Sequence, residues 1–280
     1  MTVVVLDGGT GPLPPYPGWL RDAGDAPVLL TGRAPAGVVG AYAEVRSFPG
    51  YATAADVERC VLDLARRGVV SAIVATATTD LVRAGALRDH LGLPGQGRDG
   101  ALAFADPVQA RRRLLRAAVP AVPVGEVRRV SDLYWYAARW GYPLRIRRRR
   151  EPPWPTVAVL RDEADVRAFC RGDVFPTPEA VPRLLAEPAP AGERRRVGAG
   201  PPDVSGPGGP DTPRRLAVAA AARAALPGWS GYPYAVDLVR APGGDWLVDT
   251  TGPDLDDPTV HRAAVRAQAG LPAREREVTG

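Results

Sequence analysis

The chain has 280 residues, of which 45% are hydrophobic, and a formal net charge of +5. That length allows one large domain or two to three small ones, and so modest a charge does not by itself indicate nucleic-acid binding. All 36 basic residues are arginine, and the sequence contains neither lysine nor asparagine, which excludes a P-loop, a lysine Schiff base and any asparagine metal ligand.

The first hundred residues alternate between short apolar runs and helical periodicity. Buried strands are expected at 3–6, 28–30 and 71–76, and helices at 53–67, capped by Thr53, and at 79–91. This alternation is typical of a parallel sheet, so residues 1–103 are predicted to form a Rossmann-like α/β domain. Asp7-Gly8-Gly9 follows the first strand at the sheet edge where α/β proteins bind ligands, but it lacks a full dinucleotide fingerprint and is interpreted as a tight turn.

Residues 104–270 are predicted to form a second domain, of α+β type. Helices are expected at 107–117, at 131–140, capped by Ser131, and at 161–170, 213–226 and 258–269. Extended segments are expected at 124–130, in a hairpin over 141–160 and in a second hairpin over 232–251. Periodicity is lost between 172 and 212, which is interpreted as a low-complexity linker or loop, and residues 271–280 are expected to be a flexible tail.

The first hairpin carries an unusual run of arginines. Leu144 and Ile146 alternate with Arg145 and Arg147, so one face is expected to be buried and the other to face solvent or a cleft. A solvated hairpin explains these arginines without any function. A nucleic-acid surface is disfavoured, because the run is short and the neighbouring aromatic residues fit helix packing.

Four segments, in this order, resemble the ATP-grasp superfamily of ATP-dependent carboxylate–amine ligases. They are LRDHLGLPGQ (87–96), FADPVQARRRLLRAAVPAVPVGEV (104–127), SDLYWYAARWGYPLRIRRR (131–149) and YAVDLVRAPGGDWLVDTT (234–251). The resemblance covers most of the chain. It implies a Rossmann-like domain followed by a reduced ATP-grasp domain, with ATP held between two α+β subdomains and Mg²⁺ bridging its phosphate oxygens.

The resemblance also implies two phosphate-binding lysines, which this sequence lacks. Pro107 stands at the position of the first lysine. Arg147 stands at the second, where it and Arg145 are the candidate phosphate-binding residues, because a guanidinium keeps the charge. The glycine-rich lid is replaced by RREPPWP (149–155), whose prolines remove the backbone N–H groups that cradle phosphate.

The metal position implied by the resemblance is also altered. Asp237 stands at the first acidic position, Asp249 at a position that is glutamate in the family, and Thr251 at the family's asparagine. Asp237 and Asp249 are therefore the candidate Mg²⁺ ligands, on facing strands of one hairpin. The alternative is that both are exposed strand carboxylates.

Two functions follow from these departures. The first is a pseudo-ligase, non-catalytic or weakened, that serves as a partner subunit of an active ligase or of a carrier in a biosynthetic pathway. The second is a working ligase with substituted residues. ATP and Mg²⁺ are doubtful cofactors under the first and required under the second.

The remaining features favour a cytoplasmic protein that binds neither membranes nor nucleic acid. No apolar run approaches the roughly 20 residues that span a bilayer, and the first residues do not form a signal peptide. Cys60 and Cys170 lie far apart and form no metal motif, so buried free thiols are expected.

Overall fold

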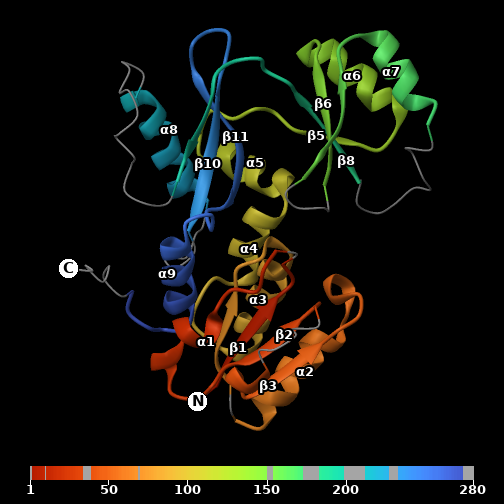
Figure 1. Cartoon of the computed structure of the whole chain (residues 1–280). Coiled ribbons are helices and arrows are strands. Elements are labelled where there is room, and N and C mark those ends of the chain that lie inside the picture. The colour runs from red at the N-terminus through yellow and green to blue at the C-terminus, as the bar shows by residue number, and fades with distance from the viewer. Residues whose placement is uncertain are drawn as a thin grey trace.

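A computed structural model describes residues 2–9, 11–33, 39–68, 70–149, 154–172, 183–198, 212–226 and 233–273. Figure 1 shows an N-terminal α/β unit below two antiparallel sheets, with the C-terminal helix returning to the N-terminal unit. The α/β and α+β prediction is confirmed: one sheet is parallel and two are antiparallel. No helix within the described ranges is long and apolar enough to cross a membrane.

The N-terminal sheet has the strand order β3-β2-β1-β4 and is parallel throughout. Its strands and the helices around it are β1 (Thr2–Asp7), α1 (Tyr16–Trp19), β2 (Val28–Thr31), β3 (Glu44–Ser47), α2 (Asp56–Arg66), β4 (Val70–Ala75) and α3 (Thr78–Leu91). The apolar runs predicted as buried strands form β1, β2 and β4, and their valines and leucines pack into two clusters, one on each face of the sheet.

Two local predictions in this unit need correction. Thr53 does not cap α2, because residues Tyr51–Thr53 form a separate 3-10 turn and the helix begins at Asp56. The short strand β3 was not predicted, because its four residues are polar or only half-buried and show no clear alternation.

A continuous pair of helices leads out of the N-terminal unit. Helix α4 (Arg98–Ala105) packs against α3, and α5 (Pro107–Arg116) follows directly after Asp106. Asp106 caps α5 by accepting a hydrogen bond from the Val108 N–H, and Pro107 occupies the first helical turn, where proline is tolerated. The domain boundary predicted after residue 103 therefore falls within a helix.

The first antiparallel sheet has the order β5-β8-β6-β7. Its strands and helices are β5 (Gly125–Val127), α6 (Val130–Trp140), β6 (Leu144–Arg148), β7 (Thr156–Leu160), α7 (Glu163–Cys170) and β8 (Leu184–Pro188). Leu144 and Ile146 face α6 and α7 in one apolar cluster. Ser131 does not cap α6; the Asp132 carboxylate instead accepts hydrogen bonds from the backbone N–H groups of Arg128 and Arg129.

The second antiparallel sheet has the order β11-β10-β9 and is covered by a helix. Its elements are β9 (Arg194–Val197), α8 (Thr212–Ala225), β10 (Tyr234–Arg240) and β11 (Trp246–Pro253). The prediction of a low-complexity linker or loop over 172–212 is wrong for residues 184–188 and 194–197, which form β8 and β9. β8 is an inner strand of its sheet, paired with both β5 and β6. Residues 173–182 and 199–211 lie outside the described part of the chain.

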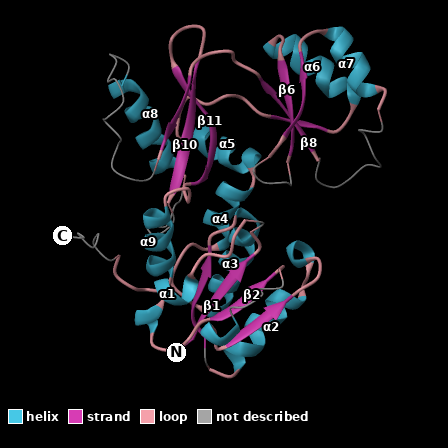
Figure 2. Ribbon diagram, viewed as in Figure 1, coloured by secondary structure: helices cyan, strands magenta, loops and turns pink. Residues whose placement is uncertain are grey.

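The last helix, α9 (Pro258–Gln268), packs on the N-terminal unit rather than on the antiparallel sheets that precede it (Figures 1 and 2). The Gln268 side-chain oxygen accepts hydrogen bonds from the Ala75 N–H and from Arg88, each at 2.9 Å. The predicted second domain, 104–270, therefore ends in a helix that belongs spatially to the first. Of the predicted flexible tail, residues 274–280 lie outside the described part.

Candidate functional site

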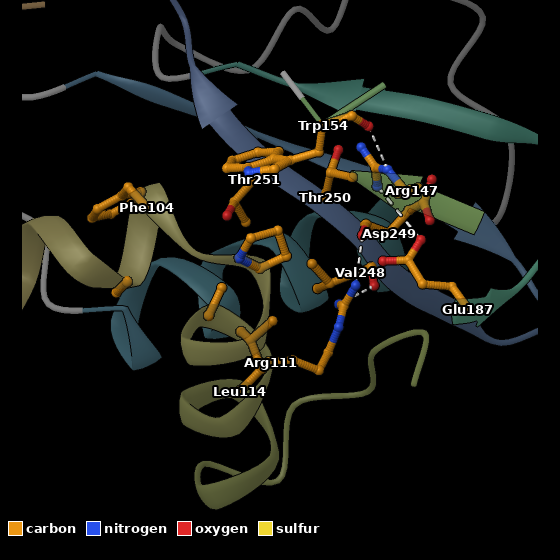
Figure 3. Close-up of a pocket in the computed structure, with 13 residues that line it drawn as sticks. Phe104, Arg111, Leu114, Arg147, Trp154, Glu187, Val248, Asp249, Thr250 and Thr251 are labelled. Atoms are coloured by element: carbon orange, nitrogen blue, oxygen red, sulfur yellow. Dashed lines mark hydrogen bonds and ion pairs between the residues drawn. The ribbon is translucent and has the colours of Figure 1, made fainter. Parts of the chain in front are cut away.

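A pocket lies where helices α4 and α5, the β6–β8 sheet and the hairpin strand β11 meet (Figure 3). Its apolar wall includes Phe104, Leu114, Trp154 and Val248. Its polar wall is formed by Arg111, Arg147, Glu187, Asp249, Thr250 and Thr251. The cavity has a volume of about 20 Å³. It therefore holds one or two water molecules in this arrangement, and a purine ring does not fit unless the surrounding elements separate.

Asp249 is the centre of the polar wall and is held by arginines from two sheets. Arg145 on β6 donates hydrogen bonds to both Asp249 carboxylate oxygens, at 3.3 Å to Oδ2 and also to Oδ1. Arg194 on β9 donates to Oδ2 as well. Burial acts to raise the pKa of Asp249, but the hydrogen bonds and charges of these arginines outweigh burial and hold the pKa below its ordinary value.

Glu187 is the second carboxylate of the site and comes from β8. It is 1% exposed, and its Oε2 accepts hydrogen bonds from Arg145 Nε at 3.0 Å and Nη2 at 2.7 Å. Arg147 lies on the same sheet, with its Nη1 3.5 Å from Glu187 Oε2 and its Nε donating to the Trp154 carbonyl at 2.7 Å. Arg145 therefore joins the two carboxylates across the gap between the sheets.

Arg111 reaches the site from helix α5 (Figure 3). Its terminal nitrogens donate to the backbone carbonyls of Val248 at 2.7 Å and Asp249 at 2.6 Å. Burial lowers the pKa of Arg111, and the neighbouring carboxylates act in the opposite direction. The contact fixes β11 against α5 next to the Asp249 side chain.

Three buried polar atoms that belong to residues lining the pocket have no hydrogen-bond partner within the described residues. They are Arg111 Nε, Glu187 Oε1 and Trp154 Nε1. Two of these atoms are donors and one is an acceptor, so the pocket presents complementary groups to a small polar molecule or to water.

The candidate metal ligand Asp237 lies apart from this network. Its Oδ2 accepts a hydrogen bond from Thr250 at 2.7 Å, and its Oδ1 is 3.7 Å from Arg196. Asp237 is paired in register with Thr250, and a bulge in β11 leaves Asp249 outside that register. The structure thus places Asp249, Arg145 and Arg147 in one cluster, and Asp237 does not contact them.

Comparisons with solved structures give one consistent result. The chain covers 98% of a RimK domain ATP-grasp protein from Sphaerobacter thermophilus and is itself covered to 98%, with 19% identity and a TM-score of 0.61. An L-amino acid ligase from Bacillus licheniformis matches over 92% of this chain and 68% of its own, with 15% identity and a TM-score of 0.67. An N5-carboxyaminoimidazole synthetase from Staphylococcus aureus matches over 98% of this chain and 78% of its own length, with 12% identity and a TM-score of 0.69.

The chain has the ATP-grasp fold. The predicted resemblance is thereby confirmed at the level of fold. No protein-family model and no curated protein sequence matches the chain. The identities to the solved structures are too low to carry an activity, so the chemistry has to be argued from the residues of the site.

The residues of this ATP-grasp fold do not fit a magnesium ion at the predicted position. Both oxygens of Asp249 are engaged by guanidinium groups, and Asp237 is turned to Thr250 and Arg196. Within the described ranges no group of three or more acidic, histidine or cysteine side chains is placed to hold a metal ion. The positive charge that faces Asp249 in this structure is supplied by arginine.

The segment that replaces the glycine-rich lid is described only in part. Residues 150–153 lie outside the described ranges. Arg149, just before them, is buried, and it donates to Asp106 at 3.0 and 2.6 Å and also to Glu126. Arg149 therefore serves to connect β6, β5 and the start of α5, and it is not a free cation for a ligand.

Several residues of the site were not predicted from the sequence, and four of them contribute to its charges or hydrogen-bonding groups. Glu187 and Arg194 lie in the stretch that was interpreted as a linker. Trp154 lies in the RREPPWP segment, which the sequence identifies only as a replacement for the glycine-rich lid. Arg111 did leave a signal, because it follows Val108 and precedes Leu114 by three residues each, which places a charge on the buried face of α5.

The carboxyl edge of the parallel sheet, where the fold class often binds ligands, is filled by the protein's own side chains. Asp7 accepts hydrogen bonds from Tyr16 at 3.2 Å, Thr31 at 3.4 Å and Arg33 at 2.5 Å. The Gly8 N–H donates to the buried carboxylate of Asp80 at 2.6 Å. A Cβ atom at Gly8 would lie 2.8–2.9 Å from side-chain atoms of Tyr51, Thr79 and Asp80, so glycine lets the backbone approach these side chains closely.

Asp80 should make the stability of the protein depend on pH. Burial raises the pKa of Asp80 to about 6, above its ordinary value of 3.8, although the Gly8 hydrogen bond and Arg83 act to lower it. The folded state therefore holds a proton that the unfolded chain releases, and this stabilising contribution is lost as the pH rises through about 6.

The Asp80→Asn variant keeps an acceptor for Gly8 and removes the ionisation. Its stability relative to the parent protein is expected to rise by about 2–3 kcal/mol between about pH 4 and about pH 7, since one pKa unit corresponds to about 1.4 kcal/mol. Urea unfolding at both pH values measures this difference. If the stability difference between the variant and the parent protein does not change with pH, the raised pKa of Asp80 is contradicted.

Proposed function

We propose that this chain is a pseudo-ligase of the ATP-grasp fold, with little or no turnover, that acts in the cytoplasm as a partner subunit in a biosynthetic pathway. The observation that carries the proposal is the state of Asp249. A carboxylate that is held on both oxygens by Arg145 and Arg194 is not available to a metal ion. Phosphoryl transfer from ATP depends on metal ions that neutralise the developing charge, so loss of this ligand removes a main part of the chemistry.

The closed gap between the sheets supports the same proposal. The ion pairs of Arg145 with Glu187 and Asp249 cross the space between β6–β8 and β11. The remaining cavity of about 20 Å³ is far smaller than a nucleotide. Binding of ATP would therefore require these buried ion pairs to break, and the free energy of breaking them would be subtracted from the affinity.

A second function, a working ligase with substituted residues, is favoured by one observation. Arg111, Glu187 and Trp154 line the pocket, and each has one buried polar atom without a hydrogen-bond partner among the described residues, which favours a site that takes a polar ligand. Under this alternative Arg147 binds phosphate, and Asp249 and Asp237 hold magnesium once the arginines around Asp249 have moved away.

Calorimetric titration with ATP, with and without Mg²⁺, separates the two functions. The pseudo-ligase proposal expects either no binding at millimolar ATP or weak binding that Mg²⁺ does not change. The control is the Asp237→Ala/Asp249→Ala double variant, which should behave like the parent protein toward Mg²⁺. Magnesium-dependent binding that is lost in the control would overturn the proposal and favour the working ligase.

Turnover provides the second measurement. ADP and phosphate release is measured with a panel of amino acids and carboxylates, and no release above background is expected. If release is observed, the Arg147→Ala variant tests the phosphate assignment, since removal of a charge that stabilises the transition state should lower the rate by at least about 100-fold.

A further inference from the structure

The outer face of helix α6 carries a row of one aromatic and two charged residues. The row consists of Asp132, Trp135 and Arg139, and their spacing of three and four residues is that of a helix-pairing seam. Trp135 is 57% exposed, Arg139 is exposed and Asp132 is half-buried. Helix α6 packs with α7 on the β5–β8 sheet and contributes no residue to the pocket described above.

Trp135 is exposed but held in place. Its ring meets the edge of the Tyr136 ring at a centroid distance of 5.1 Å, and Tyr136 in turn stacks on Trp140 at 4.5 Å. Tyr136 is fixed by a 3.0 Å hydrogen bond to the Glu126 carbonyl, and it packs so closely on Gly125 that no side chain fits there. An exposed tryptophan on a rigid base loses little conformational entropy when it is covered, which is the property of interface hot spots.

The row has an acidic residue near one end and a basic residue near the other, so two antiparallel copies of it have complementary charges. Asp132 lies in the first turn of α6, and Arg139 lies in the last turn, seven residues later. Among the described residues Arg139 contacts the Trp135 ring, at 5.4 Å from the guanidinium carbon, and forms no ion pair. Asp132 is fixed by its two backbone hydrogen bonds at the start of the helix.

We propose that α6 pairs with α6 of a second copy of this chain in antiparallel orientation. A two-fold axis near Trp135 places the two tryptophans against each other and sets each Arg139 opposite Asp132 of the second copy. Antiparallel pairing also opposes the two helix dipoles favourably, and a self-complementary patch is what a two-fold dimer requires. The inference stands independently of whether the pocket binds ATP.

Sedimentation velocity over a range of protein concentrations tests the proposal. The parent protein should show a monomer–dimer equilibrium at micromolar to high micromolar concentrations. The Arg139→Glu variant sets two acidic residues against each other, so its dimer dissociation constant should rise by roughly ten-fold or more. The Trp135→Ser variant, which removes the central contact, should weaken the dimer at least as much.

The matched control is Leu115→Arg, which changes a 62% exposed apolar residue on α5, outside the row. It should leave the dimer unchanged. Circular dichroism melting of Arg139→Glu should match the parent protein, because Arg139 is exposed. A parent protein that is monomeric at every concentration, or a dimer that Arg139→Glu and Trp135→Ser leave intact, would overturn the proposal.

Discussion

The Arg145→Ala variant is expected to unfold with a free energy about 3–5 kcal/mol lower than the parent protein at neutral pH. Arg145 is 11% exposed and pairs with Glu187 and Asp249, which are 1% and 4% exposed. Its removal leaves Glu187 with the 3.5 Å contact to Arg147 and Asp249 with the half-exposed Arg194, while Arg111 on α5 donates to backbone carbonyls and not to either carboxylate. Urea unfolding, followed by fluorescence of the six tryptophans, measures the change.

The pH dependence of this variant distinguishes a lost ion pair from lost packing. Without Arg145 the pKa of Asp249 should rise, so the deficit should shrink as the pH is lowered toward about 4 and the carboxylates become protonated. The control is Arg194→Ala, whose side chain is 51% exposed. Its loss should be about 1 kcal/mol or less, because solvent screens a half-exposed pair. Equal deficits in the two variants would contradict the role of Arg145.

The Arg266→Ala variant is expected to lose about 3–4 kcal/mol of unfolding free energy and to loosen the C-terminal helix. Arg266 is 2% exposed, and it donates to the carbonyls of Trp19 and Pro272 at 2.9 and 2.8 Å and pairs with Asp22 at 2.9 Å. Truncation leaves two carbonyls without this donor and a cavity beneath α9.

Hydrogen exchange localises this effect. Amides of α9 and of the edge strand β4, which α9 covers, should exchange faster in Arg266→Ala, and those of the β10–β11 hairpin should not. The control is Arg59→Ala on α2, a 74% exposed partner in a surface ion pair, which should change neither stability nor exchange appreciably. Uniformly faster exchange would mean that α9 does not open as a separate unit.

The positions of strands and helices could be predicted from the sequence where apolar periodicity is strong. The runs that became β1, β2 and β4 are largely buried, and α5 has buried residues at helical spacing. These elements, and the helices α7 and α9, lie within a few residues of their predicted positions. The packing of α9 could not be predicted in the same way. Its contact with β4 joins residues 193 positions apart, and no local pattern encodes that distance.

The amino-acid composition around β8 and β9 explains why the sequence did not predict these two strands. Leu184-Leu185-Ala186 is a short apolar run, but it is followed by a stretch rich in proline, glycine and arginine that resembles a linker. β9 is RRRV, and three arginines in four residues do not alternate in hydropathy. Their pairing with neighbouring strands, rather than any propensity of their own, makes them strands.

The site was predictable only in its positions along the chain. Arg145, Arg147 and Asp249 were found from their places in the resemblance, and the structure brings them together. Their mutual contacts were not foreseen, because the sequence does not show that a candidate metal ligand and a candidate phosphate ligand bind each other. That Arg145 and Arg147 bind phosphate, and that Asp249 binds Mg²⁺, stays a prediction.

The contacts of both Arg145 and Arg194 with Asp249 also restrict how such a site can evolve. A metal-holding version needs Asp249 free of both Arg145 and Arg194, yet replacing Arg145 alone leaves unpaired buried acids and a less stable protein. A cation could bind Asp249 only after both Arg145 and Arg194 have been replaced, whereas the protein loses stability as soon as Arg145 is replaced. The substitutions are therefore epistatic, and selection for stability alone is expected to keep the arginines in place.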